Sequence, residues 1–265
     1  MIHAMTLTPT SDILVHTEDG VCTLTFNRVA KKNSITQAMY GAMADALTAA
    51  RDDAAVRVVV FQGDLAIFSA GNDLGDFMNA SANSLGGETP VMRFMYQLAD
   101  FPKPVIAAVC GPAVGIGTTL LLHCDLVYAG DNAAFSLPFV NLGLCPEFSS
   151  SLLLPQLMGY HRAAEALLLG EPFLAEAALE VGLVNRVVPP SECNALAQRQ
   201  ARKLAAKPLS ALMESKRLMK SGQAATVRTR MAQEGESFGR MLHEPAAREA
   251  VSAFMEKRHP DFSRV

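Results

Sequence analysis

The stretch that decides the fold is KPVIAAVCGPAVGIGTTLLLHCDLVYAGDNAAFSLPFVNLGLCPE, residues 103–147. It opens with an apolar, β-branched run over 105–109 that is long enough for one buried strand. Gly111-Pro112 ends this run, the turn Gly115-Ile116-Gly117 follows, and the pattern over 118–123 is helical. A strand, a glycine turn and a helix start in this order leave several backbone N–H groups pointing outward at the positive end of the helix.

Such a turn serves one of three purposes. It holds a phosphate, it holds an oxyanion that forms only during a reaction, or it simply joins a strand to a helix. The phosphate interpretation is the weakest, because the segment has neither G-x-x-x-x-G-K-[ST] nor the third glycine of a dinucleotide-binding fingerprint. The oxyanion role and the plain turn both remain open on these residues alone.

The composition describes 265 residues, half of them hydrophobic, which is enough for one large domain or a domain with an appendage. A net charge of −3 and a pI near 6.1 argue against nucleic acid or an anionic membrane as the main partner. The five cysteines are scattered without a C-x-x-C, and the histidines lack metal-binding spacing, so we expect reduced thiols and no metal site. Without a signal-like N-terminus or a membrane-length apolar run, we expect a cytoplasmic protein.

The segments before the central stretch alternate between strand and helix patterns. We expect a hairpin formed by 13–15 and 21–26, an amphipathic helix over 35–47 that Thr36 caps, and a buried strand over 58–62. A helix around 91–100 then leads into the central stretch. After it, we expect helices from 149, over 161–169 and over 174–182, followed by a last strand over 184–188.

The end of the chain has a helical pattern throughout, over roughly 192–206, 208–221, 224–242 and 245–257. The change from a mixed α/β pattern to an all-helical one near Lys207-Pro208 divides the chain into a core, residues 1–206, and a helical region, residues 207–265. The helical region has more apolar side chains than a segment exposed to water on all sides would have. We therefore expect it to dock on another subunit as well as on its own core.

Three loop-like segments are candidate ligand contacts. NRVAKKN, residues 27–33, holds three cations that either form a solvated surface or, for Lys31 and Lys32, face the phosphates of a ligand. FSAGNDL, residues 68–74, has small residues that let the backbone approach a partner closely, so it is either a plain turn or the source of a second N–H for the same oxygen. NASANSLGGETP, residues 79–90, is expected near the mouth of a binding site.

The chain resembles the crotonase, or enoyl-CoA hydratase/isomerase, superfamily over nearly its whole length. The matching segments are NRVAKKNSI (27–35), FSAGNDL (68–74), KPVIAAVCGPAVGIG (103–117), CDLVYAGDNAAFSLPFVNLGL (124–144) and EKRHPDFS (256–263). The resemblance implies an α/β fold, a spiral of ββα turns with a C-terminal helical trimerisation region, and assembly into homotrimers or hexamers. It also implies acyl thioesters of coenzyme A as substrates, with no metal and no redox cofactor.

The resemblance also assigns the parts of the site. Carried over by position, the two N–H groups of an oxyanion hole belong to Asn72 and Ile116, and Gly115 lies in the same CoA-binding turn. A thioester enolate needs two preorganised donors, and losing one typically costs about 10²–10³ in rate. The carried-over contacts to CoA itself are the backbone near Ser69 and Ala70 for the adenine, and Lys31 or Lys32 for the phosphates.

The catalytic positions indicate one branch of the family. Its hydratases use two glutamates that flank a water, and those positions are Thr119 and Phe139 here, neither of which is a base. The segment LCPE, residues 144–147, resembles instead the Δ3,Δ2-enoyl-CoA isomerase branch, whose single catalytic glutamate is then Glu147. One base suffices, because Glu147 takes a proton from C2, the thioester oxygen carries the dienolate charge, and the same acid returns the proton at C4.

Glu147 also has a purely structural interpretation, since a first-turn glutamate behind a proline is favoured by the helix dipole. Phe148 follows it where the isomerase branch usually has glycine, a departure that either narrows the pocket or changes the substrate. The alternatives to an isomerase are a hydratase with another arrangement, a different CoA-ester lyase or hydrolase, and a non-catalytic acyl-CoA-binding or RNA-binding relative. The acidic pI counts against RNA.

Overall fold

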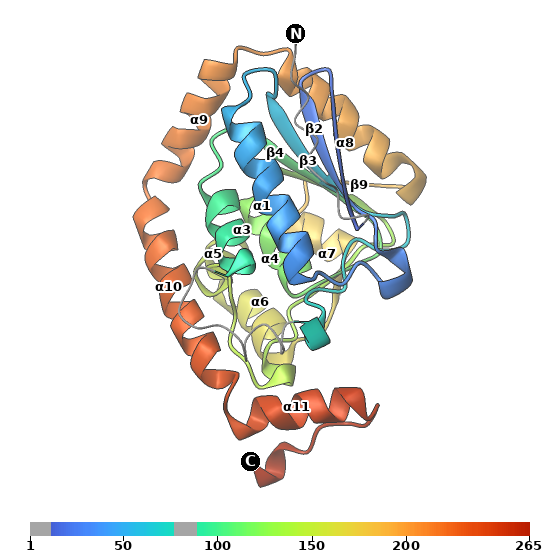
Figure 1. Cartoon of the computed structure of the whole chain (residues 1–265), viewed down its shortest axis with the longest axis vertical. Helices are drawn as coiled ribbons and strands as arrows, with labels where there is room; N and C mark the ends of the chain where they lie inside the picture. The colour runs from blue at the N-terminus through green and yellow to red at the C-terminus, as the bar shows by residue number, and fades with distance from the viewer. Residues whose placement is uncertain (1–11, 77–88) are drawn as a thin grey trace.

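The computed structural model of the protein describes residues 12–76 and 89–265 (Figure 1). The loop expected over 79–90 lies outside these residues except for its last two. One of these, Pro90, is already the first residue of helix α3 (Pro90–Ala99), whose cap is Thr89. No helix in this part of the chain has the length and apolar character needed to cross a bilayer.

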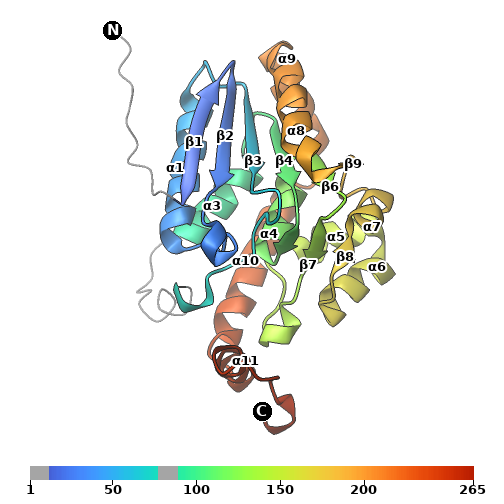
Figure 2. The ribbon, with the colours of Figure 1, turned by 90° about the vertical axis from the view of Figure 1, so that its right-hand side faces the viewer.

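The main sheet has six strands in the order β1-β2-β3-β4-β6-β9, and its first five strands lie side by side in Figure 2. The two strands β1 and β2 pair in an antiparallel manner as the predicted hairpin, while the other neighbours are parallel. Parallel strands need long crossover connections, and helices fill these connections here. The strands are β1 (Ile13–Glu18), β2 (Val21–Phe26), β3 (Val58–Gln62), β4 (Val105–Val109), β6 (Leu126–Gly130) and β9 (Arg186–Val188).

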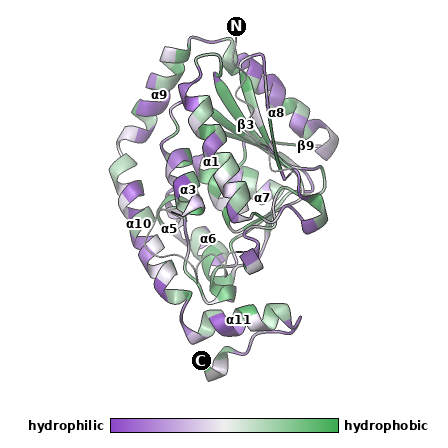
Figure 3. Ribbon diagram, in the orientation of Figure 1, coloured by the Kyte–Doolittle hydropathy of each residue, from purple (hydrophilic) through white to green (hydrophobic). Residues whose placement is uncertain are grey.

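The central strands of the sheet are buried on both faces, which explains their unbroken apolar runs. Along β3, Val59 and Phe61 face the larger core with helices α1 (Gln37–Asp52) and α3, while Val58 and Val60 face helix α8 (Pro190–Ala205). Figure 1 shows α1 and α3 on one side of the strands and α8 on the other, and the strands are strongly hydrophobic in Figure 3. As predicted, Thr36 caps α1 by accepting a hydrogen bond from the N–H of Met39.

A second, smaller sheet orders β5 (Pro112–Val114), β7 (Ala134–Ser136) and β8 (Phe173–Leu174). The chain passes from β4 into β5 at Gly111, whose φ is +66° and where an added Cβ would lie 1.9 Å from the carbonyl oxygen of Ala66. Strand β6 likewise leads into β7. Two main-sheet strands, β4 and β6, thus each feed a short strand of the second sheet before the chain turns helical, as expected for a spiral of ββα turns.

The C-terminal helices pack against the core of their own chain. They are α9 (Leu209–Ser221), α10 (Ala224–Met241) and α11 (Pro245–Met255), which run down one edge and across one end of the molecule in Figure 1. The buried Lys216 of α9 donates to Asp125 Oδ2 at 2.7 Å and to the carbonyl of Lys103 at 2.8 Å. Ala247 of α11 joins an apolar cluster with Leu137 and Leu154 of the core.

The helix expected over 118–123 begins two residues earlier than predicted. The carbonyl of Gly115 accepts from the N–H groups of Thr118 and Thr119 at 2.9 and 3.0 Å, so Gly115 is its N-cap. The remaining elements are η1 (Val29–Lys31), α4 (Ile116–Thr119), η2 (Leu120–His123), η3 (Val140–Leu142), α5 (Ser150–Met158), α6 (Tyr160–Ala164), the π-helical turn η4 (Glu165–Leu169), α7 (Ala175–Glu180) and η5 (Phe262–Arg264).

Candidate active site

The two turns singled out in the sequence lie against each other. The N–H of Val114 donates to the carbonyl of Ser69 at 2.9 Å, and Ser69 forms an isolated parallel bridge with Ala113. Gly71 has φ +83°, and a Cβ there would lie 2.7 Å from the carbonyl oxygen of Val114. This close backbone approach explains why the turn requires glycine.

Each turn presents one backbone N–H that the surrounding backbone does not use. The N–H of Ile35 donates to Gly71 and the N–H of Asp73 donates to Ile35, at 2.8 and 2.9 Å, so the N–H of the intervening Asn72 is directed away from residue 35. Ile116 is the first residue of α4, where an N–H has no acceptor within the helix. Neither N–H has a hydrogen-bond acceptor among the described residues. Two donors from adjacent turns are the arrangement that an oxyanion hole needs.

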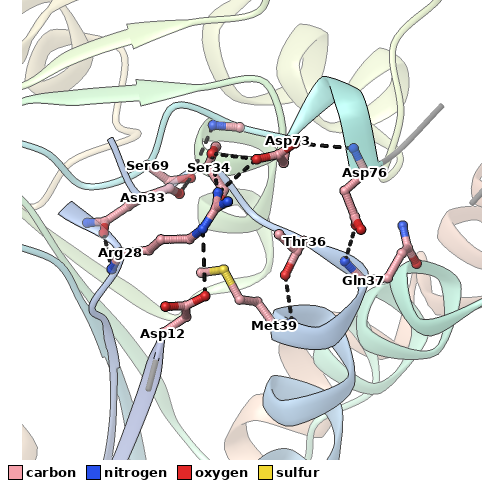
Figure 4. Close-up of polar contacts among 11 residues, drawn as sticks. Asp12, Arg28, Asn33, Ser34, Thr36, Gln37, Met39, Ser69, Asp73 and Asp76 are labelled. Carbon is pink, nitrogen blue, oxygen red and sulfur yellow. Dashed lines mark hydrogen bonds and ion pairs between the residues drawn. The ribbon is translucent and has the colours of Figure 1, made fainter. Parts of the chain in front are cut away.

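A polar network fixes the first of these turns (Figure 4). Arg28 donates to Asp73 Oδ2 at 2.8 Å and to the hydroxyl of Ser34 at 2.7 Å, and it pairs with Asp12 at 3.6 Å. Of the three cations in the 27–33 loop, Arg28 is therefore half-buried and paired, so the solvated-surface interpretation is wrong for it. The buried Asn33 donates from Nδ2 to the carbonyls of residues 67 and 68, both at 3.1 Å, which ties the loop to the same turn.

The residues assigned to CoA are brought together by the same contact between loops. Ala70 donates its N–H to the carbonyl of Lys32 at 2.9 Å, and the Lys31 and Lys32 side chains are exposed beside it. Ser69 is buried, with its hydroxyl donating to Asn33, and both its backbone N–H and its carbonyl are hydrogen-bonded. Of the two backbone positions assigned to the adenine, Ala70 is thus the more accessible. Gly115, with φ +55°, has open space where a Cβ would stand.

Glu147 is a buried carboxyl group, with 8% of its surface exposed, and it lies on the loop before α5. Thr119 Oγ1 of α4 donates to Glu147 Oε1 at 2.9 Å. Burial raises the pKa of Glu147 to about 7, the Thr119 hydrogen bond opposes this shift, and the charge of Glu234 adds to it. A carboxyl with a pKa near 7 is suited to both accepting and returning a proton at neutral pH.

Tyr40 of α1 holds the side chain of Asn72 in the oxyanion turn. Its buried hydroxyl donates to Asn72 Oδ1 at 2.5 Å. Burial raises the Tyr40 pKa well above 10, and the charge of Glu147 raises it further. The site therefore combines Glu147, Thr119, Tyr40 and Asn72 in one apolar setting. Within 12–76 and 89–265, no cluster of three or more His, Cys, Asp or Glu residues has the arrangement of a metal site.

Comparison with known proteins decides the family, because the family model described as "Enoyl-CoA hydratase/isomerase" matches residues 16–264. The chain belongs to the enoyl-CoA hydratase/isomerase family. Among solved structures, one titled "Structure of Pseudomonas aeruginosa OdaA" superposes with a TM-score of 0.90 at 50% identity, covering 93% of this chain and 99% of that one.

Two curated relatives in the family are named for different reactions, one as an isomerase and one as a hydratase. "Enoyl-CoA delta isomerase 2" of Rattus norvegicus is 40% identical over 216 residues, which are 80% of this chain and 55% of the rat protein, so this chain spans only about half of that relative. "2,3-dehydroadipyl-CoA hydratase" of Escherichia coli K12 is 34% identical over 253 residues, covering 95% of this chain and 98% of the relative. Membership in the enoyl-CoA hydratase/isomerase family thus leaves the choice between isomerase and hydratase open.

Two positions of this family member depart from the patterns noted in the sequence. Phe148, which stands where the isomerase branch usually has glycine, has φ +58°, a left-handed backbone conformation that glycine adopts without strain. Its ring is completely buried, stacked on His123 at 4.0 Å between centroids and edge-on to Phe94 at 6.4 Å. Phe139 is buried in the apolar cluster that contains Leu137.

Three contributions to the candidate site of this enoyl-CoA hydratase/isomerase family member were not predicted from the sequence. Thr119 was noted only as a lost glutamate, although its hydroxyl orients Glu147 across 28 residues of chain. Tyr40 lies on the apolar face of α1, where the sequence predicts only a core residue, yet its hydroxyl donates to Asn72. Glu234 lies on the C-terminal helical region, and its charge raises the Glu147 pKa. No local pattern signals such contacts, because each joins elements that are distant in the sequence.

Proposed function

We propose that the protein is a Δ3,Δ2-enoyl-CoA isomerase that shifts a 3-enoyl-CoA double bond to the 2-position. The observation that carries the proposal is Glu147, buried, with its pKa raised to about 7 by burial above all, beside two turns with unused N–H groups. The two positions where the family's hydratases carry glutamates hold Thr119 and Phe139, and neither side chain exchanges protons at neutral pH.

In this mechanism Glu147 acts twice. The ionised carboxylate takes a proton from C2, and the C2–H electrons move into a dienolate whose negative charge rests on the thioester oxygen. The N–H groups of Asn72 and Ile116 stabilise that oxyanion. The protonated Glu147 then donates the same proton to C4, which leaves a double bond between C2 and C3. No water or second base takes part, so one carboxyl suffices.

A hydratase is the second candidate, favoured by the E. coli hydratase that matches this chain along 98% of its own length. Another CoA-ester lyase or hydrolase, or a non-catalytic acyl-CoA-binding relative, also fits the family. The deciding experiment measures turnover of 3-enoyl-CoA and 2-enoyl-CoA side by side with the purified protein. We expect rapid isomerisation and slow or absent hydration; rapid hydration without isomerisation would reject the isomerase.

We further propose that Lys31 and Lys32 bind the phosphates of CoA. Both side chains are exposed beside the Ala70–Lys32 contact, and exposed charge pairs are screened by salt. Calorimetry should show acyl-CoA binding that weakens as ionic strength rises, and the salt dependence should fall in the Lys31→Gln, Lys32→Gln double variant. The control is Lys257→Gln, which removes the charge of an exposed lysine near the C-terminal end of the chain and should leave the salt dependence of binding unchanged. Absence of CoA-ester binding at low salt would end the CoA assignment.

A homotrimer or hexamer is the proposed assembly, with acyl-CoA as the small-molecule partner. The C-terminal helices expose large apolar side chains, namely Leu218, Met219, Phe254 and Met255, each at least 58% exposed in the single chain. A closed symmetric oligomer is the usual way to cover such a surface. Light scattering at micromolar concentration should report at least three chains per particle, and a monomer would contradict the proposal.

A further inference from the structure

The turn after Glu147 has an unusual backbone. Phe148 and Ser149 both have positive φ, +58° and +59°, although neither is glycine. Two such residues in a row are strained and persist only where the surrounding structure holds them. Ser149 is also the N-cap of α5, yet its own side chain makes no capping hydrogen bond. The turn that carries the proposed base therefore depends on contacts from elsewhere in the chain.

Those contacts come from α10, some 80 residues further along the chain. Glu234 accepts from the N–H of Ser149 at 2.5 Å through Oε2, and from the N–H of Ser151 at 3.0 Å through Oε1. The hydroxyl of Ser151 donates to the same Oε1 at 2.5 Å. Glu234 thus supplies the cap that α5 lacks, and these hydrogen bonds stabilise its carboxylate although only 6% of the residue is exposed.

Two further hydrogen bonds join the same turn to its surroundings. The hydroxyl of Ser149 donates to the carbonyl of Val227, which also lies on α10, at 2.8 Å. The hydroxyl of Ser150 donates to the carbonyl of Glu147 itself at 2.6 Å, so the backbone of the base is linked to the first turn of α5. A displacement of α5 from α10 is therefore transmitted directly to Glu147.

We propose that Glu234 is a positioning residue for the catalytic base: it holds the left-handed turn that places the Glu147 carboxyl in the site. The inference rests on the proposed role of Glu147. The helical region then helps to position the catalytic base of its own chain, a role separate from assembly.

The charge of Glu234 also acts on the base. It adds to the burial that raises the Glu147 pKa to about 7, because a second negative charge nearby disfavours ionisation. Two ionisable groups feel the charge of Glu147, namely the Tyr40 phenol of α1 and the Cys145 thiol. Burial raises the pKa of each from a normal value of 9 or above, so both are neutral near pH 7. Arg230 faces Glu234 from the same helix and favours its ionised form, although burial raises the Glu234 pKa overall.

The test compares Glu234→Gln and Glu234→Ala with Glu236→Gln, the same change on the exposed face of α10. Glutamine keeps the shape and one acceptor oxygen but loses the charge, whereas alanine removes every contact. We expect the acidic limb of the kcat pH profile to move to lower pH in Glu234→Gln, because the variant lacks the second negative charge that raises the Glu147 pKa. In Glu234→Ala we expect kcat to fall by about 10–100-fold with KM changed less than about twofold, since a misplaced catalytic group costs rate rather than binding.

A second readout does not depend on any particular activity. Carbon-13 NMR of labelled glutamate, with Glu147→Gln to assign the signal, measures the titration of Glu147 in each variant. A changed Glu147 titration in Glu234→Ala but not in Glu236→Gln supports the positioning role even if the protein proves not to be an isomerase, because only the alanine variant loses every contact that holds the turn. An unchanged Glu147 titration in Glu234→Ala, or an equal loss of kcat in Glu236→Gln, would overturn it. Circular dichroism establishes that each variant is folded.

Discussion

Glu147→Gln is expected to lower the rate of 3-enoyl-CoA to 2-enoyl-CoA conversion by about 10²–10⁴, the usual cost of removing a general base. Glutamine has the shape of glutamate and can still accept the hydrogen bond from Thr119, so the site should keep its geometry. Affinity for the CoA ester should stay nearly unchanged, because the proposed base interacts with the reacting carbons and not with the nucleotide. Steady-state kinetics and calorimetry on the same preparation separate the two effects.

The pH dependence of the wild-type protein supplies an independent check on Glu147. The base must be ionised to take the C2 proton, and burial raises its pKa to about 7. The value of kcat/KM for isomerisation should therefore rise with pH through about 7, and this limb should vanish in the residual activity of Glu147→Gln. Wild-type turnover in Glu147→Gln would leave Glu147 only a structural role in the turn before α5, and the base would have to lie elsewhere.

Gly71→Ala should reduce isomerisation by about 10²–10³, the typical cost of losing one oxyanion donor. The added Cβ would lie 2.7 Å from the carbonyl oxygen of Val114, a backbone atom that cannot move without shifting the neighbouring turn. The turn that carries the Asn72 N–H must then separate from the turn that carries the Ile116 N–H. The loss should appear mainly in kcat, since the oxyanion exists only during the reaction.

The matched control is Gly159→Ala. Gly159 has nearly the same φ, +79° against +83°, but nothing lies within 4 Å of the position of its Cβ. Both variants therefore carry the backbone strain of alanine at positive φ, and only Gly71→Ala adds the collision between turns. Kinetics together with thermal unfolding should show destabilisation in both variants and a selective loss of kcat in Gly71→Ala. Equal activity in the two variants would remove the oxyanion role from the 69–73 turn.

Elements with a strong local pattern were predictable from the sequence. The hairpin β1–β2 shows in two β-rich runs around Gly20, and α1 shows in the four-residue spacing from Ile35 to Leu47, with Thr36 before it. These signals lie within a few residues of one another, so they survive without knowledge of the rest of the chain. The start of α4 was missed by two residues because Gly115, read as part of the turn, caps the helix with its carbonyl.

The candidate site was predictable in part. The resemblance placed Asn72, Ile116 and Glu147 by position, and the structure brings the first two turns into contact and buries the third residue. Arg28 was wrongly grouped with the solvated cations, since its partner Asp73 lies 45 residues away. The position of the Phe148 ring was likewise not predictable from the sequence. The ring packs on His123, which lies 25 residues earlier and reaches the same core only when the chain folds.

The sequence by itself determined the alternation of strands and helices, the glycine turns and the family-matched positions, because periodicity, turn chemistry and motif order are properties of short segments. Only the tertiary structure decided what surrounds the Glu147 carboxyl. Its raised pKa comes first from burial, and its orientation comes from Thr119 on α4 and from a turn that Glu234 on α10 holds. Burial and contacts between distant elements arise when the whole chain packs, so no segment read alone contains them.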